Sequence, residues 1–227
     1  MGKTACRQCH TALECGFPTT KVAQVFSIVM AAGWPIWPLL LTSVIAVALV
    51  IERSVSLRRA KVVPAGLLDK VLDDLRHQDV SAEMIRRVEM NSPLGRVLAA
   101  GLRNIDSSRD VMKEAIDETG RAVVHDLERF LTTLGTIASV SPLMGLFGTI
   151  IGMIDIFAAQ GSTGANPVLL AQGISTALYA TGLGLVIAIP SLIFWRHFRR
   201  LVDDFVVDME QQAIRMVGVV HDMQRKK

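Results

Sequence analysis

Hydrophobic residues form three long runs along the chain, separated by stretches in which charged residues recur. No charged residue lies between Lys21 and Glu52, and Asp155 is the only one between positions 130 and 195. A helix needs about 20 apolar residues to cross the hydrocarbon core of a bilayer. The pattern therefore predicts an all-α membrane protein with three membrane-spanning helices, the second at about Phe130–Phe157 and the third at about Ile174–Trp195.

The polar stretches between these runs predict the domain organisation. Gln160–Pro167 separates the second run from the third, and its Gly, Ser, Asn and Pro residues are typical of a turn. The expected segments are an N-terminal extension at 1–24, a first membrane helix at 25–52, a helical region at 53–129, a second membrane helix at 130–158, a turn at 159–173, a third membrane helix at 174–195 and a helical tail at 196–227.

The first apolar run begins with aromatic residues. Trp34 and Trp37 stand at its start, where aromatic side chains anchor a helix at the membrane surface. Ala46–Ala48 has the small residues of a signal-cleavage site, but three further apolar residues continue the run beyond it. We therefore predict an uncleaved helix.

Lysine and arginine residues near the ends of the runs predict the orientation of the helices. They follow the first run, precede the second and follow the third, whereas the turn at 159–173 has none. These basic residues are Arg53, Arg58, Arg59, Lys61, Arg121, Arg129, Arg196, Arg199 and Arg200. By the positive-inside rule, the region at 53–129 and the tail are expected in the cytoplasm, while the N-terminus and the turn are expected to face outward.

The cytoplasmic region is predicted to be helical. Residues 64–105 have short amphipathic patterns that break at Asp79–Ser81 and at Asn91–Pro93. Ser107–Asp110 resembles a capping box, after which apolar residues keep helical spacing into the second run without an intervening proline. We therefore predict one helix from about Ser108 to Phe157.

The tail has a heptad pattern, with one helical face marked at alternating steps of three and four residues. The positions are Val202, Phe205, Met209, Gln212, Met216, Val219 and Met223. Such a pattern is typical of helix-on-helix packing. It is compatible both with packing against the helix at 108–130 of the same chain and with contact between subunits.

Small and polar residues of the second and third runs fall on one helical face of each, and Gly148 and Gly152 also form a GxxxG pair. The face residues are Pro142, Gly145, Thr149 and Gly152 on the second run, and Ala177, Thr181, Gly184 and Ala188 on the third. Contact with lipid does not favour small residues, whereas close packing between membrane helices does. The two threonines either bond back to carbonyls of their own helix or present hydroxyls to a neighbouring helix.

Composition and charge exclude several classes of function. Apolar residues make up 51% and charged residues 20% of the chain, the net charge is +3, and there is no basic tract with interleaved aromatic residues, so we expect no nucleic-acid partner. All three cysteines lie in the first 15 residues, so a disulfide framework is not expected.

Cys6–His10 is a CxxCH motif, the attachment signature of c-type haem, and with Cys15 it also has the residue types of a zinc site. No apolar signal segment precedes the motif, and no pattern for an axial ligand lies near it. We therefore expect no metal and no cofactor. Residues 1–24 are expected to be disordered or to lie upstream of a native start at Val25.

The membrane runs offer hydroxyl groups but no charge at mid-membrane. Thr149 and Thr181 do not titrate, but they donate and accept hydrogen bonds and can order water. Asp155 is expected near the outer end of its helix, facing the interface or the turn. A proton path needs a titratable group, so we expect a partner helix to bring a carboxylate beside the threonines. No nucleophile–base pair or phosphate loop indicates an enzyme.

Two motifs resemble the MotA/TolQ/ExbB proton-channel family, with ExbB as the nearest branch. They are Ser141–Met153 (SPLMGLFGTIIGM), and Gly173–Leu185 (GISTALYATGLGL) followed by Ala188–Pro190. The resemblance covers about 26–210. It implies three spans with long cytoplasmic helical extensions, a homo-pentameric ring around an ExbD-like subunit with an essential intramembrane Asp, a TonB-like partner and a place in the bacterial inner membrane.

The resemblance also implies roles for single residues. Thr149 and Thr181 match the pore-facing threonines of the family. Thr176 stands where many ExbB and TolQ members have Glu, so the intramembrane glutamate is missing, and Ser175, Thr176 and Tyr179 are its expected hydrogen-bonding substitutes. The expected helix-packing set is Pro142, Gly145, Gly148, Gly152, Ala177, Gly184, Ala188 and Pro190.

The function that this resemblance implies is that of an inner-membrane proton-channel subunit, which couples the proton motive force to TonB-dependent transport across the outer membrane. A TolQ-like role in envelope constriction is the nearest alternative. A haem-bearing electron-transfer subunit that uses Cys9 and His10 is a distant one.

Overall fold

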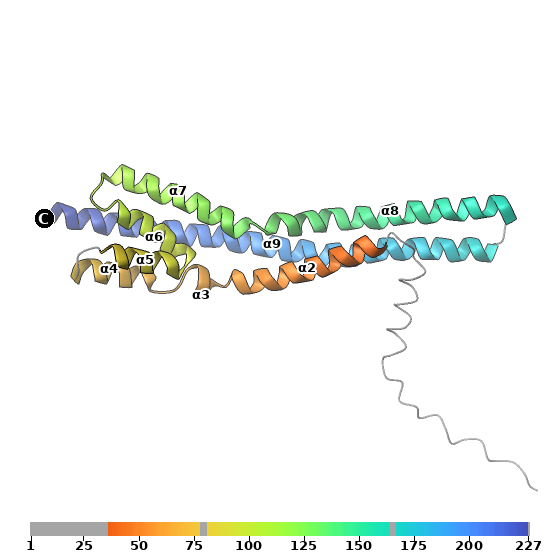
Figure 1. Cartoon of the computed structure of the whole chain (residues 1–227), viewed down its shortest axis with the longest axis horizontal. Coiled ribbons are helices and arrows are strands. Elements are labelled where there is room, and N and C mark those ends of the chain that lie inside the picture. Colours follow the sequence, from red (N-terminus) through yellow and green to blue (C-terminus); the bar gives the residue numbers. More distant parts are fainter. Residues whose placement is uncertain (1–35, 78–80, 164–166, 227) are drawn as a thin grey trace, which may run out of the picture. The chain divides into compact units, whose positions relative to one another are not determined.

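The structure, a computed structural model, describes residues 36–77, 81–163 and 167–226 (Figure 1). These residues form α-helices and no strand. The helices are α2 (Ile36–Ser56), α3 (Arg59–Val62), α4 (Leu67–His77), α5 (Ala82–Asn91), α6 (Pro93–Arg103), α7 (Arg109–Glu128), α8 (Leu131–Thr163) and α9 (Pro167–Lys226). The expected extension at 1–24, with its CxxCH motif, and Trp34 lie outside the described residues.

Three helical segments of the described chain are long and apolar enough to cross a membrane. They lie in Ile36–Ser56, Arg109–Ala158 and Gly173–Arg225. The prediction of an all-α chain with three such segments is therefore confirmed for the described residues.

The chain divides into two compact units. The first unit comprises Met1–Leu39 and Met144–Gly184, and the second comprises Leu40–Leu143 and Leu185–Lys227. The small-residue faces of α8 and α9 lie mainly in the first unit, and the charged helices α3 to α7 lie in the second.

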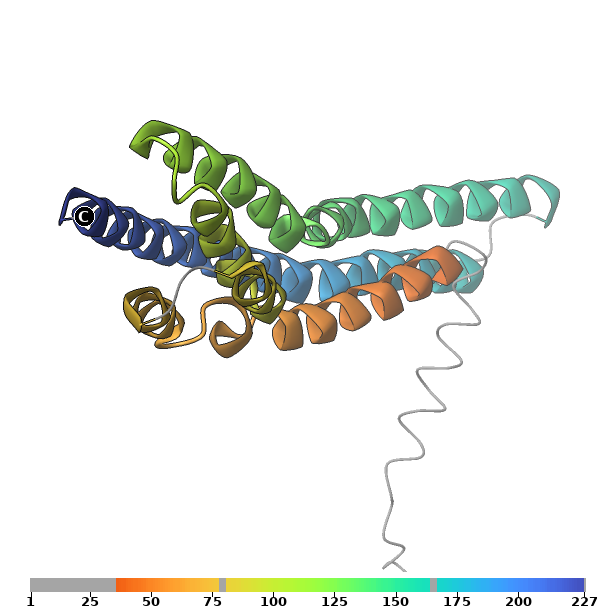
Figure 2. The same cartoon turned by 60° about the vertical axis from the view of Figure 1, so that its left-hand side comes forward.

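Helix α6 is the centre of the second unit. It packs against α5 and α7 (Figure 2), and its residues from Leu94 to Leu102 are nearly all buried. Leu94 and Leu98 are fully inaccessible to solvent and join the same hydrophobic core as Val123 of α7 and Phe205 of α9. The helix is buried over most of its surface because apolar residues cover most of it, with the half-exposed Arg96 on the remaining side.

Serine residues cap the N-termini of α5, α6 and α7 in the second unit. Ser81, Ser92 and Ser108 each accept a hydrogen bond from the backbone N–H three residues on, which satisfies one of the free donors of a helix start. Pro93 follows Ser92 as the first residue of α6, where its missing N–H costs nothing. The cap of α7 is Ser108, so the prediction that Ser107 opens a capping box is wrong by one residue.

The predicted single helix from Ser108 to Phe157 is divided. α7 ends at Glu128 and α8 begins at Leu131. In an unbroken helix the Leu127 carbonyl would accept from the N–H four residues on, but here it accepts from Arg53 Nη1 at 3.2 Å. The break therefore arises from a side chain of α2 that reaches into the helix, and nothing in the local sequence signals it.

The tail packs within its own chain, on a face that differs in part from the predicted one. Val202, Phe205, Met209 and Met216 are buried as the heptad pattern predicts, but Ala213, Val217 and Val220 are buried in addition, while Gln212 and Val219 are only half-buried. A straight helix repeats every 3.6 residues and drifts away from a strict heptad. The buried stripe of α9 follows this drift.

Helix replaces most of the predicted turn at 159–173. α8 continues to Thr163 and α9 begins at Pro167, which leaves only 164–166 outside the described residues. Proline is well suited to the first position of a helix, so Pro167 starts α9 instead of prolonging the turn.

An ion pair joins α6 to α7 and gives a testable pH dependence. Arg96 Nη1 donates to Asp126 Oδ2 at 2.7 Å, and this hydrogen bond is the main reason why the pKa of Asp126 lies below its ordinary value. A carboxyl group with a lowered folded-state pKa stabilises the fold above its unfolded-state pKa, and this stabilisation is lost as the pH falls through the folded-state pKa.

Asp126→Asn is therefore expected to lower the melting temperature at pH 7 by at most about 3 °C, because both partners are half-exposed. The difference from the wild type should begin to shrink below about pH 4 and disappear as the pH falls through the lowered pKa of Asp126. Thermal unfolding of both proteins across this range checks the prediction, and a difference that persists in acid would contradict it. Glu83→Gln, in an ion pair exposed by more than four-fifths, is the control.

Candidate functional site

Small residues bring α8 and α9 close together in the first unit. Gly145, Gly148 and Gly184 are buried, and Ala177 and Ala180 are 5% and 3% exposed. A Cβ atom added to Gly145 would lie 2.9 Å from the Ala180 carbonyl oxygen and 3.0 Å from Thr181 Cα, both backbone atoms. The two helix backbones therefore approach at Gly145 more closely than a side chain would allow.

The same contact continues along α8. A Cβ atom added to Gly152 would lie 3.2 Å from Ala177 Cβ. Small residues thus line both sides of the contact over several turns, which is how membrane helices gain the dispersion energy that holds them together.

The two threonine hydroxyls have different partners. Thr181 Oγ1 donates across the contact to the Gly145 carbonyl at 3.3 Å, whereas Thr149 Oγ1 donates to the Leu146 carbonyl of its own helix at 2.7 Å. Both threonines are half-buried. Thr181 therefore bonds between helices, and Thr149 bonds back to its own helix as many membrane threonines do.

Ser175 and Tyr179 lie away from this contact. Both are exposed, Tyr179 by 46%. Gly182 lies on the same side of α9, and a Cβ atom added there would meet no atom within 4 Å. Within one chain the structure therefore does not bring Ser175 and Tyr179 to Thr149. Thr176 lies in α9, but its side chain is outside what the structure describes.

Three residues of the expected packing set belong to the second unit. Ala188 is 5% exposed, Pro142 is half-buried, and Pro190 is exposed and lines a groove between α2 and α9. These residues are thus separate from the glycine contact of the first unit.

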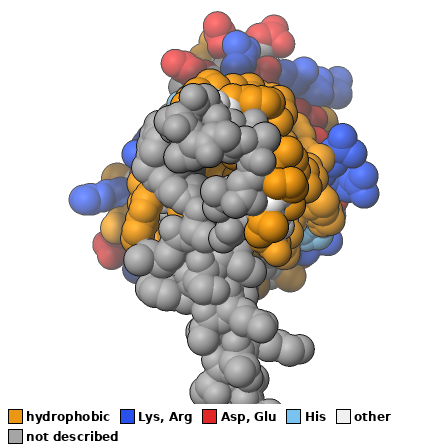
Figure 3. Space-filling view, turned by 90° about the vertical axis from the view of Figure 1, so that its right-hand side faces the viewer, with side chains coloured by type: hydrophobic (Ala, Val, Ile, Leu, Met, Phe, Trp, Pro, Cys, Tyr) orange, Lys and Arg blue, Asp and Glu red, His pale blue; other side chains and the backbone are white. Residues whose placement is uncertain are grey.

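The described surface of the first unit is mainly apolar, and Asp155 is the only charged residue between Met144 and Gly184. Figure 3 looks at the chain from this end, and the described side chains around the grey residues are mainly hydrophobic. Asp155 is exposed on α8. Because α8 continues to Thr163, Asp155 lies about two turns inside the helix, and not at its end as expected from sequence.

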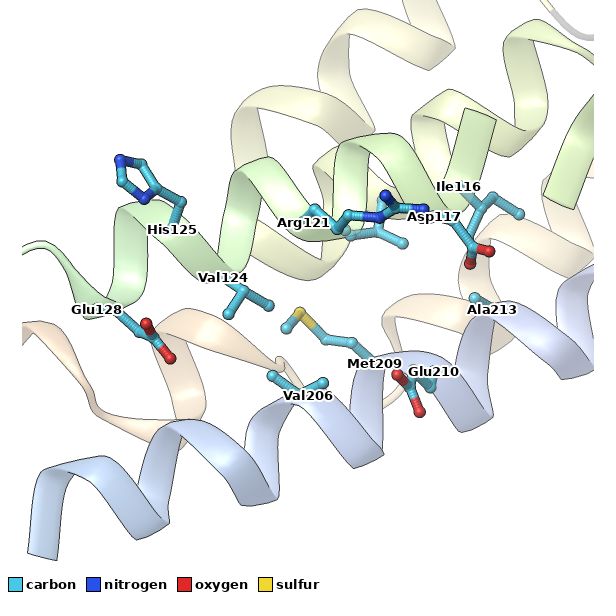
Figure 4. Close-up of a pocket in the computed structure, with 12 residues that line it drawn as sticks. Ile116, Asp117, Arg121, Val124, His125, Glu128, Val206, Met209, Glu210 and Ala213 are labelled. Carbon is cyan, nitrogen blue, oxygen red and sulfur yellow. The ribbon is translucent and has the colours of Figure 1, made fainter. Parts of the chain in front are cut away.

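The second unit contains a separate cavity of about 530 Å³ between α7 and α9. Figure 4 shows Val124, Val206 and Met209 pointing into the space between the two helices. Charged residues stand around it, and one of them, Glu128, accepts from Arg199 at 2.9 Å. Among the described residues, no group of three His, Cys, Asp or Glu side chains is placed to hold a metal ion.

Arg53 is the residue whose position the sequence did not reveal. Its side chain is 7% exposed, pairs with Glu52 at 2.6 Å, and lies with its guanidinium carbon 4.8 Å from the centre of the Phe130 ring. The sequence shows it only as a basic residue after the first apolar run. Its contacts with Leu127 and Phe130 join residues that lie far apart along the chain.

The family match and the matches to known proteins agree. Residues 89–211 match the MotA/TolQ/ExbB proton channel family. The biopolymer transport protein ExbB-like 3 of Synechocystis sp. is 34% identical over 186 residues, which are 80% of this chain and 89% of the relative. The biopolymer transport protein exbB1 of Vibrio cholerae is 28% identical over 165 residues, 70% of this chain and 72% of the relative.

The Tol-Pal system protein TolQ of Haemophilus influenzae is 34% identical over 102 residues, which are 40% of this chain and 45% of the relative. The family match at 89–211 includes Gly145, Thr149 and Thr181. The close contact between α8 and α9 therefore lies in the part of the chain that matches the family.

Proposed function

The chain belongs to the MotA/TolQ/ExbB proton channel family, and from this premise we propose that it is the ring-forming subunit of an ExbB/ExbD-type motor in the bacterial inner membrane. In this proposal the motor couples the proton motive force to TonB-dependent transport across the outer membrane. The earlier identification of the family from two motifs is confirmed. The ring, its partners and its cargo are the proposed part.

The observation that supports the proposal most directly is that the first unit has hydroxyl groups on its helices and a single charged residue between Met144 and Gly184. Thr181 and Thr149 hold hydroxyl groups in defined positions, and Asp155 is the only charged side chain between Met144 and Gly184. Hydroxyl groups can order water but cannot take up a proton at physiological pH. Asp155 is exposed and makes no hydrogen bond with either threonine, so in this proposal the titratable group beside the threonines comes from a partner.

The proposed partner is an ExbD-like subunit with an intramembrane aspartate. The exposed side of α9, with Ser175, Tyr179 and the open position at Gly182, offers a helix of that partner both hydrogen-bonding groups and room for close approach. Thr176 completes the proposed polar lining. Five copies of the chain would surround the partner helices, and a TonB-like protein would receive the resulting motion.

The proposed topology has three spans, with the N-terminus in the periplasm and the C-terminus in the cytoplasm. The basic residues after α2 and in the part of α9 that follows Trp195 support it, since such residues concentrate on the cytoplasmic side. The second unit, with its charged helices α3 to α7, would then lie mostly in the cytoplasm.

A TolQ-like subunit that energises envelope constriction is the second candidate. The match to a protein named TolQ at 34% identity favours keeping it. Both candidates use the same mechanism with a different cargo. The haem-bearing alternative rests on Cys6–His10, which lies outside the described residues, and haem staining of the purified protein would test it.

Replacement of Thr181 by valine is expected to stop growth on a ferric siderophore as sole iron source. Valine keeps the shape of threonine but loses the hydroxyl that donates to the Gly145 carbonyl, and loss of a hydrogen-bonding group in the proposed path should slow proton flux by about tenfold. The measurement compares gene-replacement strains that carry either form, with membrane levels checked by immunoblotting.

Thr136→Val is the matched control, because the Thr136 hydroxyl is exposed and bonds back to the Thr132 carbonyl of its own helix. Equal growth of the Thr181 and Thr136 variants would show that Thr181 only packs. If the wild-type chain itself does not restore growth, the TonB-dependent role is wrong, and restored resistance to detergent would indicate the TolQ-like role.

A further inference from the structure

Helix α5 presents an exposed apolar side chain next to a basic one. Met90 is 83% exposed and lies on the side of α5 opposite the buried Val88. Arg86, one turn before Met90 on the same side, is exposed as well. None of the ion pairs in the described part of the chain involves Arg86. The outer face of α5 therefore combines an apolar group with a positive charge.

This combination distinguishes Met90 from the other exposed apolar residues of the second unit. In helices α3 to α7, and in α9 beyond Trp195, the large apolar residues that are exposed are Met90, Val111, Val207 and Ile214. Single exposed apolar residues are common on protein surfaces. Among these four, however, only Met90 has an arginine or lysine three or four residues away on its own helix.

The cavity between α7 and α9 has the complementary character. Its apolar lining consists of Val97, Ile116, Val124, Val206, Met209 and Ala213. The charged groups that line it are Asp117, Arg121, Glu128 and Glu210, and Glu128 is already paired within the chain. With His125 neutral, two carboxylates and one guanidinium remain, which leaves a net negative charge. The cavity therefore suits an apolar side chain that has a positive charge beside it.

Met90 and the cavity lie at the same level along the helices of the second unit. Helix α6 follows α5 after a single residue, and Arg96 of α6 pairs with Asp126 of α7 at 2.7 Å. The neighbours of these two residues, Val97 and His125, both line the cavity. Copies related by rotation about the membrane normal keep each residue at its level, so α5 of one copy can meet the cavity of the next.

We propose that Met90 of one copy of the chain inserts into the α7–α9 cavity of a neighbouring copy, where Arg86 pairs with Asp117 and Glu210. The face of α5 and the cavity are different surfaces, so each copy can use both, and a head-to-tail contact of this kind forms a ring when its rotation closes. An apolar side chain in a pocket with charged groups around it is the usual anatomy of an interface. The contact rests on the proposed ring, but not on proton flux, the partner or the cargo.

Cysteine cross-linking of the full-length chain in membranes tests the contact. The native cysteines, which all lie in the first 15 residues, are first replaced by serine. Met90→Cys is then combined with Val206→Cys, since Val206 points into the cavity (Figure 4). A short thiol-specific cross-linker should produce a ladder of oligomers. The matched control pairs Met90→Cys with Val207→Cys, because Val207 is 51% exposed on the same helix but does not line the cavity.

A charge swap tests the pairing of Arg86. Arg86→Glu adds a carboxylate beside those of the cavity, so the dissociation constant of the assembly in detergent, measured by light scattering, should rise about tenfold or more. The second substitution Glu210→Arg should restore it. Arg87→Glu is the matched control, because Arg87 is 81% exposed and pairs with Glu83 of its own helix. It should change the dissociation constant by about twofold at most.

Cross-linking through Val207 as strong as that through Val206 would overturn the proposal, as would failure of Glu210→Arg to restore assembly of Arg86→Glu. A cross-link from the cavity to a protein of another size, in place of a second copy, would also overturn it. Chains that stay single in the membrane would exclude both the ring and this contact. If the expected ladder forms in a strain that does not grow on a ferric siderophore, the contact stands and the TonB-dependent role is wrong.

Discussion

Replacement of Gly145 by alanine is expected to separate α8 from α9 and to abolish the activity of the complex. The added methyl group would lie 2.9 Å from the Ala180 carbonyl oxygen and 3.0 Å from Thr181 Cα. Backbone atoms cannot turn away as a side chain can, so the helices must move. Overpacking of this kind costs about 1–3 kcal/mol, and the movement also breaks the bond from Thr181 to the Gly145 carbonyl.

The matched control is Gly182→Ala, on the same pair of helices. No atom lies within 4 Å of the added methyl group, and alanine is about 1 kcal/mol better than glycine inside a helix. The stability of the single chain should therefore stay the same or rise. Thermal unfolding in detergent measures the stability of both variants, and proton uptake by vesicles that hold the chain with its proposed partner measures the activity of Gly145→Ala. A stable and active Gly145→Ala protein would show that the close approach is not needed.

This contact shows what the sequence could predict and why. The segregation of charge marked the spans, because burial in lipid excludes charged side chains over about 20 residues. The spacing of Gly145, Gly152, Ala177 and Gly184 predicted one small face on each helix, since helical periodicity alone decides which residues share a face. It could not predict that Thr181 bonds across the contact and Thr149 does not.

The features that sequence reasoning missed depend on residues far apart in the chain or on weak local preferences. Gln160–Pro167 has turn-type residues, but glycine and serine are tolerated in a helix at a small cost, so α8 continues to Thr163. Ser107 and Ser108 are both suitable caps, and packing of α7 selects Ser108. The break between α7 and α8 comes from Arg53, 74 residues before the Leu127 carbonyl to which it donates.

Replacement of Arg53 by methionine is expected to destabilise the second unit and to change the junction between α7 and α8. Methionine keeps the apolar stem but removes the hydrogen bond to Leu127 and the contact of the guanidinium with the Phe130 ring. Loss of a buried hydrogen bond from a charged group costs about 1.5–3 kcal/mol. The freed Leu127 carbonyl can then accept from the N–H of Leu131, as in an unbroken helix.

Hydrogen exchange of the backbone amides measures this change directly. The amide of Leu131 should become more protected in Arg53→Met, even though the protein as a whole is less stable, and a merely destabilising substitution would lower protection throughout. Arg59→Met is the control, because Arg59 is 73% exposed in its pair with Asp208 and should cost at most about 1 kcal/mol. If Leu131 exchanges faster in Arg53→Met than in the wild type, Arg53 does not hold the helices apart, and the break between α7 and α8 has another cause.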